Sequence, residues 1–361
     1  MIKVYILIGT RPNFIKVTQF KTEVAKYPNL KVQLIHTGQH AGAAMADVFF
    51  DQFNLQPDYL LNIPQASPLQ QMAAILSSLE TLINTIGKPN YLMVVGDVNS
   101  TLAGALVANK MEIPLMHLES GLRSFDNTMP EEHNRIVTDA LATCFFTTEE
   151  IATTNLLNDK KDPESLHFVG NTMIDTLVAF KSQIDAATIL TDKNIMPNTY
   201  CLMTMHRPSN VDTAQGLAVI VDLIQHIATT HQVVFPIHPR THNNLQKFGL
   251  LQELTAIKNL LFTDPLDYFA FQKLIKHSAF VVTDSGGVQE ETTFNKVPCL
   301  TLRDNTERPV TCILGTNTLC NASNVKLYIN QITAGTYKTG TVPPLWDGKA
   351  TQRIVEVWSK L

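Results

Sequence analysis

The sequence predicts an α/β protein made of two Rossmann-like, doubly wound domains with a cleft between them. The chain has 361 residues, which is more than one hydrophobic core usually holds, so two domains are the expected number. Short apolar runs alternate with amphipathic stretches of helical period, which is typical of parallel sheets covered by helices on both faces. The alternation pauses once, at the polar, proline-containing residues 192–199 (DKNIMPNT).

The expected strands form two series, one on each side of this pause. They are residues 3–9, 31–38, 91–97, 113–119, 144–148 and 166–170, and then residues 200–205, 232–238, 259–263, 279–284, 297–302 and 316–320. Helical periodicity fills the intervals, for example at residues 68–87 and 173–184. We therefore expect an N-terminal domain at 1–190, a C-terminal domain at 191–345, and a final helix at 346–361 that packs on the N-terminal domain.

Composition narrows the functional class. The net charge is -4 and the pI about 6.3, which gives no electrostatic reason to expect nucleic acid or an anionic membrane as a partner. The apolar runs have strand length, too short to span a membrane, and no signal-peptide pattern begins the chain. The cysteines are scattered, form no CxxC pair and predict free thiols in a reducing cytoplasm: Cys144, Cys201, Cys299, Cys312 and Cys320.

Polar residues gather directly after the expected strands. Open parallel sheets bind ligands beyond the carboxyl ends of their strands, so this shared position predicts a binding site in the cleft. The residues are Thr10, Arg11, Gly38, Gln39, His40, Gly96, Asp97, His117, Glu119, His206, Arg207, His238, Ser285, Gly286 and Gly287.

The segment TDSGGVQEE, residues 283–291, predicts a nucleoside diphosphate site. Backbone N–H groups at the start of a helix can hold phosphates with the help of Ser285, and Gly286 and Gly287 allow a close approach. Glu291, one turn later, can accept hydrogen bonds from a ribose diol. The structural alternative, first-turn acids that favour the helix dipole, explains Glu290 well.

Several other candidates have structural alternatives of similar weight. In GTRPNFIK, Thr10 and Pro12 are ordinary helix-start residues, whereas the cations Arg11 and Lys16 near a helix N-terminus indicate a bound anion. Asp97 is either an acid–base group or the cap of the following helix. Glu119 is either functional or paired with Arg123.

The segment TMPEEHNR, residues 128–135, looks structural from its spacing. Thr128 and Glu131 match a capping box, while Arg135 can pair with Glu132 or Asp139 on an exposed helix face. By contrast, the strand-end His206 is an acid–base candidate, and His238 is a weaker one.

Motifs for other chemistries are missing from the sequence. It has no G-x-G-x-x-G after a strand, no P-loop, no G-x-S-x-G, and no His/Cys cluster with metal-ligand spacing. We therefore expect neither a nicotinamide cofactor nor a metal.

Taken in order, the motifs resemble the non-hydrolysing UDP-N-acetylglucosamine 2-epimerases. The resemblance runs from residue 9 to about residue 319. It rests on GTRPNFIK, GDVNSTLAGAL, HLESGLRS, MPEEHNR, VGNTMID, MHRPSNVD, HPRT, TDSGGVQEE and RDNTERP. It implies the two-domain glycosyltransferase-B architecture, a UDP-sugar substrate, no cofactor, a homodimer, and a role in polysaccharide biosynthesis.

The resemblance also implies the chemistry and its residues. UDP leaves C1 as a base removes the C2 proton, and UDP then adds back to the 2-acetamidoglucal intermediate with the proton delivered to the other face. By motif position the catalytic residues are Asp97, Glu119, Glu131 and His206. The substrate-binding residues are Arg11 and Lys16 for phosphate, Ser285, Gly286, Gly287 and Glu291 for UDP, Phe271 near the uracil, and Arg308.

Two departures from the family pattern, and one difference from sibling epimerases, bear on this expectation. Pro208 and Ser209 replace a charged residue and a Glu that commonly follow the His-Arg pair. Residues 39–49 lack the Arg-Glu-Met run with which some members bind a second substrate molecule, so we expect no such activation. A Glu-Arg-Pro run ending at Pro309 favours N-acetylglucosamine over the diacetamido uronic acid sugars of sibling epimerases.

Four alternatives stay open at the level of sequence. They are a 2-epimerase of a related UDP-diacetamido sugar, a hydrolysing epimerase, a UDP-sugar glycosyltransferase of the same fold, and a non-catalytic UDP-sugar binding module.

Overall fold

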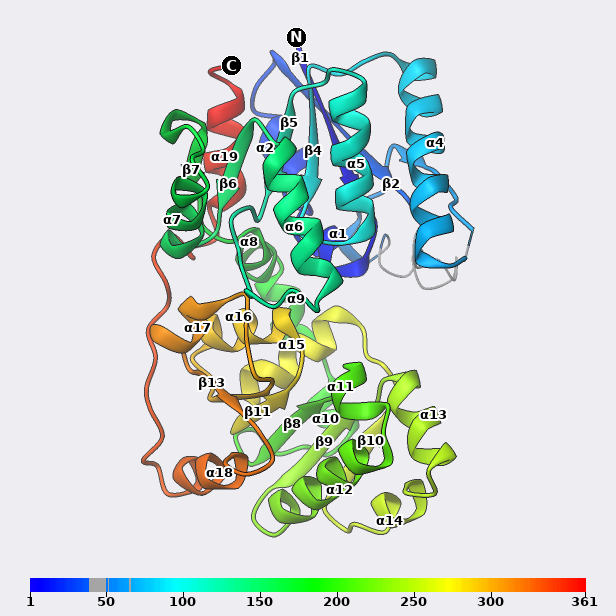
Figure 1. Cartoon of the computed structure of the whole chain (residues 1–361). Helices are drawn as coiled ribbons and strands as arrows, with labels where there is room; N and C mark the ends of the chain where they lie inside the picture. Colours follow the sequence, from blue (N-terminus) through cyan, green and yellow to red (C-terminus); the bar gives the residue numbers. More distant parts are fainter. Residues whose placement is uncertain (39–49, 51, 65) are drawn as a thin grey trace. The chain divides into compact units, whose positions relative to one another are not determined.

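The chain folds into two compact units in a computed structural model that describes residues 1–38, 50, 52–64 and 66–361. The first unit comprises Met1–Ala179 and Pro344–Leu361, and the second comprises Phe180–Pro343. Figure 1 colours the chain from its N-terminus to its C-terminus. Residues 39–49, on which the expected absence of substrate activation depends, lie outside the described residues.

The first unit is built on a parallel sheet of seven strands, in the order β3-β2-β1-β4-β5-β6-β7. Its strands are β1 (Ile2–Ile8), β2 (Leu30–His36), β3 (Tyr59–Leu60), β4 (Tyr91–Val95), β5 (Leu115–Leu118), β6 (Cys144–Thr147) and β7 (Leu166–Phe168). All were expected except β3, whose two residues are too few to show a periodic pattern.

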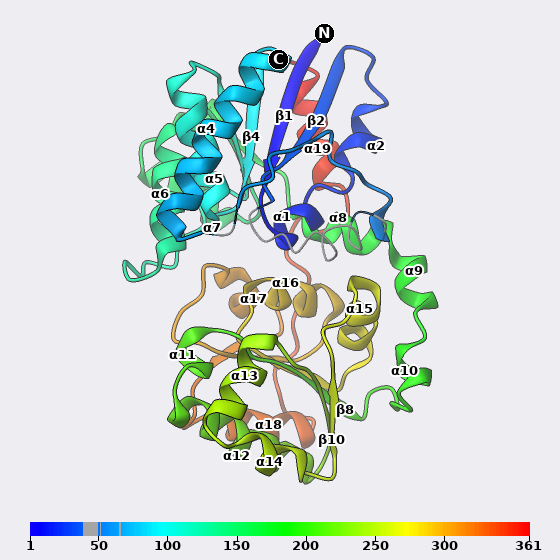
Figure 2. The ribbon, with the colours of Figure 1, turned by 90° about the vertical axis from the view of Figure 1, so that its right-hand side faces the viewer.

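Helices cover both faces of this sheet. Figure 2 shows α4 and α5 on one face and α2 and α19 on the other. Among the described residues, the helices of the unit include α1 (Arg11–Ile15), α2 (Phe20–Val24), α4 (Pro68–Ile86), α5 (Asn99–Lys110), α6 (Pro130–Leu141), α7 (Glu150–Asn158), α8 (Thr172–Ala179) and α19 (Ala350–Trp358), with a 3-10 turn at Pro163–Ser165.

The second unit repeats the plan with a six-stranded sheet, in the order β10-β9-β8-β11-β12-β13. Its strands are β8 (Tyr200–Thr204), β9 (Gln232–Pro236), β10 (Leu260–Thr263), β11 (Phe280–Thr283), β12 (Cys299–Leu302) and β13 (Asn317–Cys320). Its helices are α9 (Lys181–Ala186), α10 (Ile189–Asp192), α11 (Pro208–Val211), α12 (Ala214–Ala228), α13 (Pro239–Lys247), α14 (Leu251–Thr255), α15 (Tyr268–His277), α16 (Gly286–Asn295), α17 (Pro309–Ile313) and α18 (Val325–Thr333).

The strands of the second sheet are mostly apolar because helices cover both of its faces. On β8, Cys201 and Met203 pack into a core with α12 and α18, whereas Tyr200 and Leu202 pack into a second core with α15. Alternate side chains of a strand point to opposite faces, so covering both faces requires continuous apolar runs. Those runs are what made the strands visible in the sequence.

Each sheet has one point at which its strand order reverses. It lies between β1 and β4 in the first sheet and between β8 and β11 in the second, and the two strands at each point are parallel neighbours. The loops that follow such strands leave toward opposite faces and open a crevice at the carboxyl edge of the sheet. Arg11 and Asp97 follow the strands at the first reversal point, and His206 and Ser285 follow those at the second.

The C-terminal helix α19 belongs to the first unit, where it packs on α2. The rings of Phe20 and Trp358 stack with centroids 5.3 Å apart, and the indole Nε1 of Trp346 donates to the Thr148 carbonyl at 3.0 Å. The carboxylate of Asp175 accepts the backbone N–H groups of Ala350 and Thr351 at 3.0 and 2.5 Å. A buried carboxylate therefore holds the N-terminus of α19, where the helix dipole favours negative charge.

The expected single helix at residues 173–184 is wrong. The chain breaks at Phe180, which leaves helical geometry between α8 and α9 (φ -102°, ψ 18°). The boundary between the two units falls at this residue, and the polar stretch 192–199 lies within the second unit.

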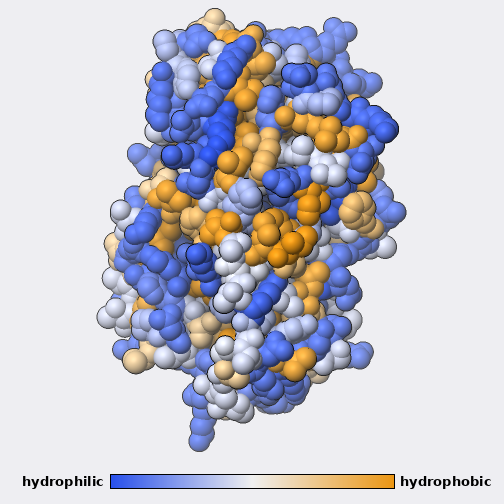
Figure 3. All heavy atoms as spheres, turned by 90° about the vertical axis from the view of Figure 1, so that its left-hand side faces the viewer, coloured by the Kyte–Doolittle hydropathy of each residue, from blue (hydrophilic) through white to orange (hydrophobic). Residues whose placement is uncertain are grey.

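The face drawn in Figure 3 shows groups of hydrophobic residues among hydrophilic ones. Apolar atoms contribute more than half of the accessible surface of a typical folded protein. None of the helices in the described part of the chain is long and apolar enough to cross a membrane.

Candidate functional site

In the first unit, a buried ion pair joins the loops that follow β1 and β5. Lys16 Nζ pairs with Glu119 Oε2, and the two residues are 5% and 4% exposed. The alternative in which Glu119 pairs with Arg123 is wrong, because Arg123 pairs with Asp139 and Asp159. The helix α1 spans only five residues and Lys16 is its C-cap, so Lys16 does not oppose the helix dipole as expected, and its cationic charge balances a carboxylate.

The loop after β4 approaches this ion pair closely. Gly96 has a φ of +65°, and a Cβ placed there would lie 3.5 Å from Lys16 Nζ. Glu119 itself has a φ of +66°, a left-handed conformation that costs free energy for a residue other than glycine. Left-handed backbone on both loops thus brings Gly96 and Glu119 to the same lysine.

Asp97 is held by the helix α6. Arg135 Nη2 donates to Asp97 Oδ2 at 2.6 Å, and Asn134 Nδ2 donates to the Asp97 carbonyl at 2.8 Å. The alternative in which Asp97 caps the next helix is wrong, because the N-cap of α5 is Val98 and no side chain caps it. The Asp97 side chain remains 21% exposed, so it can reach a ligand while it is held.

Arg135 also binds Glu132, but not on an exposed face as the spacing predicted. Its Nη1 donates to Glu132 Oε2 at 2.5 Å, and both side chains are buried. The Glu132 carboxylate additionally accepts the backbone N–H groups of Ser124 and Phe125 at 2.9 and 3.0 Å. The Arg135–Glu132 pair therefore ties α6 to the loop that precedes it.

Asp139 does not pair with Arg135. It bridges His117 Nδ1 at 2.7 Å and Arg123 Nη1 at 2.6 Å. The other ring nitrogen of His117, Nε2, lies 2.8 Å from the carbonyl of Gly96. Burial raises the pKa of the Asp139 carboxyl, but His117 and Arg123 outweigh burial and hold this pKa below its usual value. This chain of contacts fixes the backbone just before Asp97.

Glu131 is exposed in the first turn of α6, one turn before the residues that bind Asp97. The expected capping box of Thr128 and Glu131 is wrong. Met129 is the N-cap, and Thr128 Oγ1 donates to Asp126 Oδ1 at 2.6 Å instead. Glu131 makes no hydrogen bond or ion pair with the residues that the structure describes in its unit, which leaves its carboxylate available to a ligand.

In the second unit, Asp284 organises the loop after β8. Its carboxylate lies 2.8 Å from His206 Nδ1 and accepts the backbone N–H groups of His206 and Arg207. It also accepts Asn210 Nδ2 at 3.1 Å. Pro208, one of the departures from the family pattern, begins α11 within this arrangement.

His238 lies beside His206, with ring centroids 5.7 Å apart. It is the N-cap of α13, and its Nδ1 accepts the backbone N–H of Arg240 at 3.2 Å. Burial, with a contribution from the charge of His206, lowers the pKa of the His238 imidazole.

The helix α16 begins at the predicted phosphate loop. Ser285 is its N-cap and its hydroxyl makes no capping bond, while Gly286 and Gly287 are half-buried. The expectation that Glu290 favours the dipole from the first turn is wrong, because Glu290 lies beyond that turn and pairs with Arg308 Nε at 3.0 Å. Glu291, the predicted ribose ligand, is 4% exposed.

Arg308 meets the start of α16. A Cβ added to Gly286 would lie 2.8 Å from Arg308 Nη1, so glycine is what allows the guanidinium to reach the helix end. Arg308 also pairs with Glu307, which Arg303 binds at 2.8 Å. Phe271, the predicted uracil neighbour, is half-buried on α15.

The geometry agrees with comparisons to known proteins. The family model of UDP-N-acetylglucosamine 2-epimerase matches residues 22–359. The UDP-N-acetylglucosamine 2-epimerase of Methanocaldococcus jannaschii is 38% identical over 361 residues, which cover 98% of each chain. The chain belongs to the UDP-N-acetylglucosamine 2-epimerase family. The resemblance found in the sequence is thereby confirmed.

A solved structure and a second relative are also informative. A crystal structure of the M. jannaschii enzyme, in complex with UDP-GlcNAc and UDP, matches with a TM-score of 0.90 at 37% identity over the whole of both chains. This match confirms the predicted two-domain α/β class of the glycosyltransferase-B type. The UDP-2,3-diacetamido-2,3-dideoxy-D-glucuronate 2-epimerase of Pseudomonas aeruginosa is 36% identical over 99% of this chain and 100% of its own.

In this member of the epimerase family, sequence reasoning missed the role of Asp284 and the partners of Arg135 and Asp139. Asp284 stands within the TDSGG motif, and its position at the end of an apolar strand was a usable signal, because a buried carboxylate needs partners. Arg135 and Asp139 were noticed, but their partners are 38 and 22 residues away, beyond the reach of helix spacing rules.

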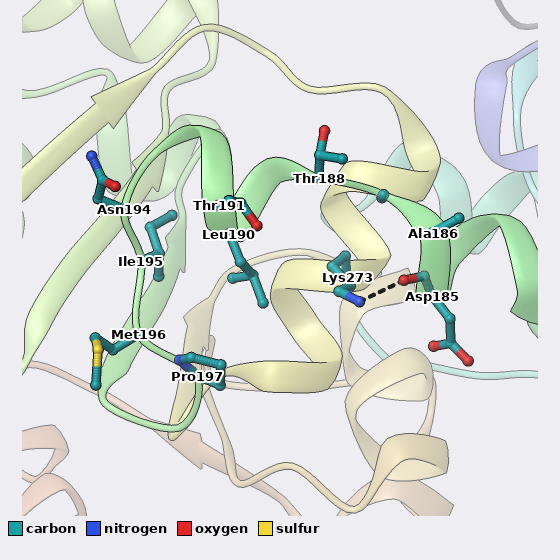
Figure 4. A pocket seen from close by; sticks show the side chains of 11 residues that line it. Asp185, Ala186, Thr188, Leu190, Thr191, Asn194, Ile195, Met196, Pro197 and Lys273 are labelled. Atoms are coloured by element: carbon teal, nitrogen blue, oxygen red, sulfur yellow. Dashed lines mark hydrogen bonds between the residues drawn. The ribbon is translucent and has the colours of Figure 1, made fainter.

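A hollow in the second unit is lined by other residues. Figure 4 shows its lining, with Lys273 donating to the carbonyl of Asp185 at 2.8 Å. The remaining lining comes from residues 186–197. None of the predicted catalytic or UDP-binding residues lines this hollow, so it is not part of the candidate site.

Proposed function

We propose that this protein interconverts UDP-N-acetylglucosamine and UDP-N-acetylmannosamine without net hydrolysis. The observation that carries the proposal is the arrangement of charged residues after β1, β4 and β5. Asp97 follows β4 and Glu119 follows the neighbouring strand β5, and each carboxylate lies beside its own cation, Arg135 or Lys16. Two held carboxylates suit a reaction that removes a proton from one face of a carbon and returns it to the other.

The chemistry requires elimination because the C2 hydrogen is not next to a carbonyl and is barely acidic. A base takes the C2 proton, the C2–H electron pair forms the C1–C2 double bond, and the C1–O pair leaves with UDP. The product is a 2-acetamidoglucal. Re-addition of UDP to C1 and of a proton to the opposite face of C2 gives the epimer. No hydride carrier enters this balance.

Asp97, Glu119 and Glu131 are the proton-transfer groups in this proposal. Lys16 and Arg135 hold Glu119 and Asp97 in place, and Glu131 is exposed in the first turn of the helix that carries Arg135. Arg11, exposed at the start of α1, would contact phosphate, and Lys16 would add positive charge nearby. An elimination site needs this cationic charge where the diphosphate departs.

The second unit supplies the groups that bind UDP. Backbone N–H groups at the start of α16, with the Ser285 hydroxyl and the Arg308 guanidinium, would hold the diphosphate. Glu291 would accept hydrogen bonds from the ribose diol, and Phe271 would pack near the uracil. His206 would face the leaving diphosphate.

The relatives favour this substrate over the diacetamido sugar. The M. jannaschii relative named for UDP-N-acetylglucosamine is somewhat more similar than the P. aeruginosa relative named for the diacetamido glucuronate, at 38% against 36% identity. The Glu-Arg-Pro run that contains Arg308 supports the same choice. A homodimer with a role in polysaccharide biosynthesis remains part of the proposal.

The deciding experiment incubates the protein with UDP-N-acetylglucosamine in deuterated water and follows the sugar by NMR, with no cofactor added. UDP-N-acetylmannosamine with deuterium at C2 is the expected product. Free N-acetylmannosamine with UDP would assign a hydrolysing epimerase instead. Substrate that keeps its C2 proton would overturn the proposal and call for the same assay with UDP-diacetamido sugars.

A further inference from the structure

Asp284 is a buried residue whose carboxylate contacts His206, Arg207 and Asn210, all in the segment that follows β8. It has 0% exposure. Its Oδ2 accepts the backbone N–H of Arg207 at 2.8 Å and the side-chain amide of Asn210 at 3.1 Å. Its Oδ1 lies 2.8 Å from Nδ1 of His206. Burial raises the pKa of this carboxyl, but His206 and the backbone donors outweigh burial and lower the pKa below its usual value.

An ionised carboxylate can only accept hydrogen bonds, so its contact determines the protonation of the histidine. Nδ1 of His206 must carry a proton to donate to Asp284. The nitrogen that remains to exchange a proton or face a ligand is therefore Nε2. His206 is 41% exposed at its side chain, so the ring is anchored at one nitrogen and open to solvent around the other.

The same residue connects this histidine to the phosphate loop. The carbonyl of Asp284 accepts Arg207 Nε at 3.0 Å. Asp284 directly precedes Ser285, whose backbone N–H is held by Thr283 Oγ1 at 3.0 Å. The side chain of Asp284 therefore controls the loop after β8, while its backbone begins the turn into α16.

We propose that Asp284 is a positioning residue that sets the tautomer and the direction of His206, so that Nε2 is presented to the leaving diphosphate. This inference rests on the proposed function. It concerns a residue that touches no substrate atom and acts only through the histidine. A carboxylate behind an imidazole also stabilises the imidazolium form, which suits a group that must oppose the negative charge of departing UDP.

The groups that face His206 in this unit support the assignment. Asp284, after β11, places a negative charge beside the ring. Burial lowers the pKa of His238, which follows β9. Arg207, on the same loop as His206, donates its Nε to the Asp284 carbonyl. The carboxylate is thus the partner that determines which ring nitrogen carries the proton.

The variant Asp284→Asn tests the idea with minimal change in shape. Its amide oxygen can replace Oδ2 and still accept the hydrogen bonds from the Arg207 backbone N–H and the Asn210 side-chain amide. Its NH₂ group then replaces Oδ1 and faces His206 Nδ1. Nδ1 must then accept, which moves the proton to Nε2. We expect kcat to fall by about 10²- to 10⁴-fold, as in other imidazole–carboxylate pairs, with UDP affinity changed by less than about threefold.

A double-mutant cycle separates positioning from general structural damage. If Asp284 acts only through the ring, Asp284→Asn should cost less than about threefold in C2 deuterium exchange when His206 is already alanine. An equal loss in both backgrounds would overturn the proposal. The matched control is Asp222→Asn, an exposed aspartate on α12 that pairs with Lys326, which should leave exchange unchanged.

A measurement on the unmutated protein keeps the proposal open to refutation whether or not the variant folds. The ¹⁵N shifts of the His206 ring should show a proton on Nδ1, and Asp284→Asn should move it to Nε2. A wild-type ring protonated only at Nε2 would overturn the inference. Because this signal needs no turnover, it distinguishes a failure here from a failure of the proposed epimerase activity, which wild-type C2 exchange reports.

Discussion

Arg135 donates to Asp97 through one end of its guanidinium, at 2.6 Å, and to Glu132 through the other, at 2.5 Å. The arginine is 2% exposed and Glu132 is 1% exposed. Asp97 is the more exposed end of this three-residue chain. One buried cation therefore stabilises the helix start and aims a candidate catalytic carboxylate.

Removing this cation should damage both stability and turnover. Arg135→Gln leaves Glu132 buried without its charged partner, which costs about 3–5 kcal/mol in such pairs, and it frees Asp97 from its anchor. We expect this loss in urea unfolding followed by circular dichroism, together with a lower kcat at temperatures where the variant is folded. Arg240→Gln is the control, because the Arg240–Asp212 pair is exposed and should be worth about 1 kcal/mol or less. Equal losses in the two variants would contradict the structural role given to Arg135.

Glu119→Gln should separate an epimerase from a UDP-sugar binding module. The amide keeps the shape of the side chain but cannot accept a proton, so we expect kcat to fall by about 10²- to 10⁴-fold, the usual contribution of a general base or acid. UDP binding, measured by calorimetry, should change little because most groups assigned to UDP, from the start of α16 to Phe271 and Arg308, lie in the second unit. Full activity in this variant would remove Glu119 from the catalytic set.

The pKa of Asp139 predicts a stability contribution that acid removes. His117 and Arg123 hold this pKa below its usual value, so the folded protein resists protonating the carboxyl. Stability from the ionised group is complete above the unfolded pKa, near ~4, and is lost as pH falls through the folded value. We expect the stability difference between wild type and Asp139→Asn to be largest at neutral pH and to shrink in acid. A difference that grows below pH ~4 would refute the assignment.

Asp175 should show the opposite dependence. Burial raises its pKa in spite of the hydrogen bonds from Thr351 and Ala350, with a further rise from Asp347. Its stability contribution is therefore greatest below the unfolded pKa and is lost as pH rises through the folded value. The wild-type advantage over Asp175→Asn should decline as pH increases from about 3.8.

Tryptophan fluorescence is suited to this measurement. The only two tryptophans of the chain, Trp346 and Trp358, are both buried in the first unit beside the helix that Asp175 holds. Urea unfolding at several pH values gives the stability difference directly. A wild-type advantage that increases with pH would contradict the raised pKa. The exposed Asp222→Asn should show no pH-dependent difference of this kind.

Much of the fold could be predicted from the sequence because a strand buried on both faces appears as a short, continuous run of apolar residues. The runs at β1, β4, β8 and β11 are apolar at successive positions, and only a sheet covered on both faces requires that. Parallel strands then place their following loops at one edge, which is why Asp97, His206 and Ser285 could be chosen before their neighbours were known. The break at Phe180 was not visible, because helical periodicity continues through it.

The partners of the site residues could not be predicted in the same way. Spacing rules describe contacts one turn apart on a helix, so they proposed Thr128 for Glu131, Arg123 for Glu119 and Asp139 for Arg135. The structure instead pairs Glu119 with Lys16, more than a hundred residues earlier in the chain. Left-handed backbone at Glu119 is what turns its carboxylate toward that lysine, and neither feature leaves a local signal.

The sequence by itself determined the two α/β units, the loops that carry the candidate site, and the chemical types of its residues. These follow from the periodicity of buried strands and from the residue types that proton transfer and phosphate binding need. Only the tertiary structure decided which charge meets which: Lys16 with Glu119, Arg135 with Asp97, and Asp284 with His206. The physical reason is that a buried charge requires an oppositely charged partner. The tertiary fold determines which residue that partner is, because it brings distant segments of the chain into contact.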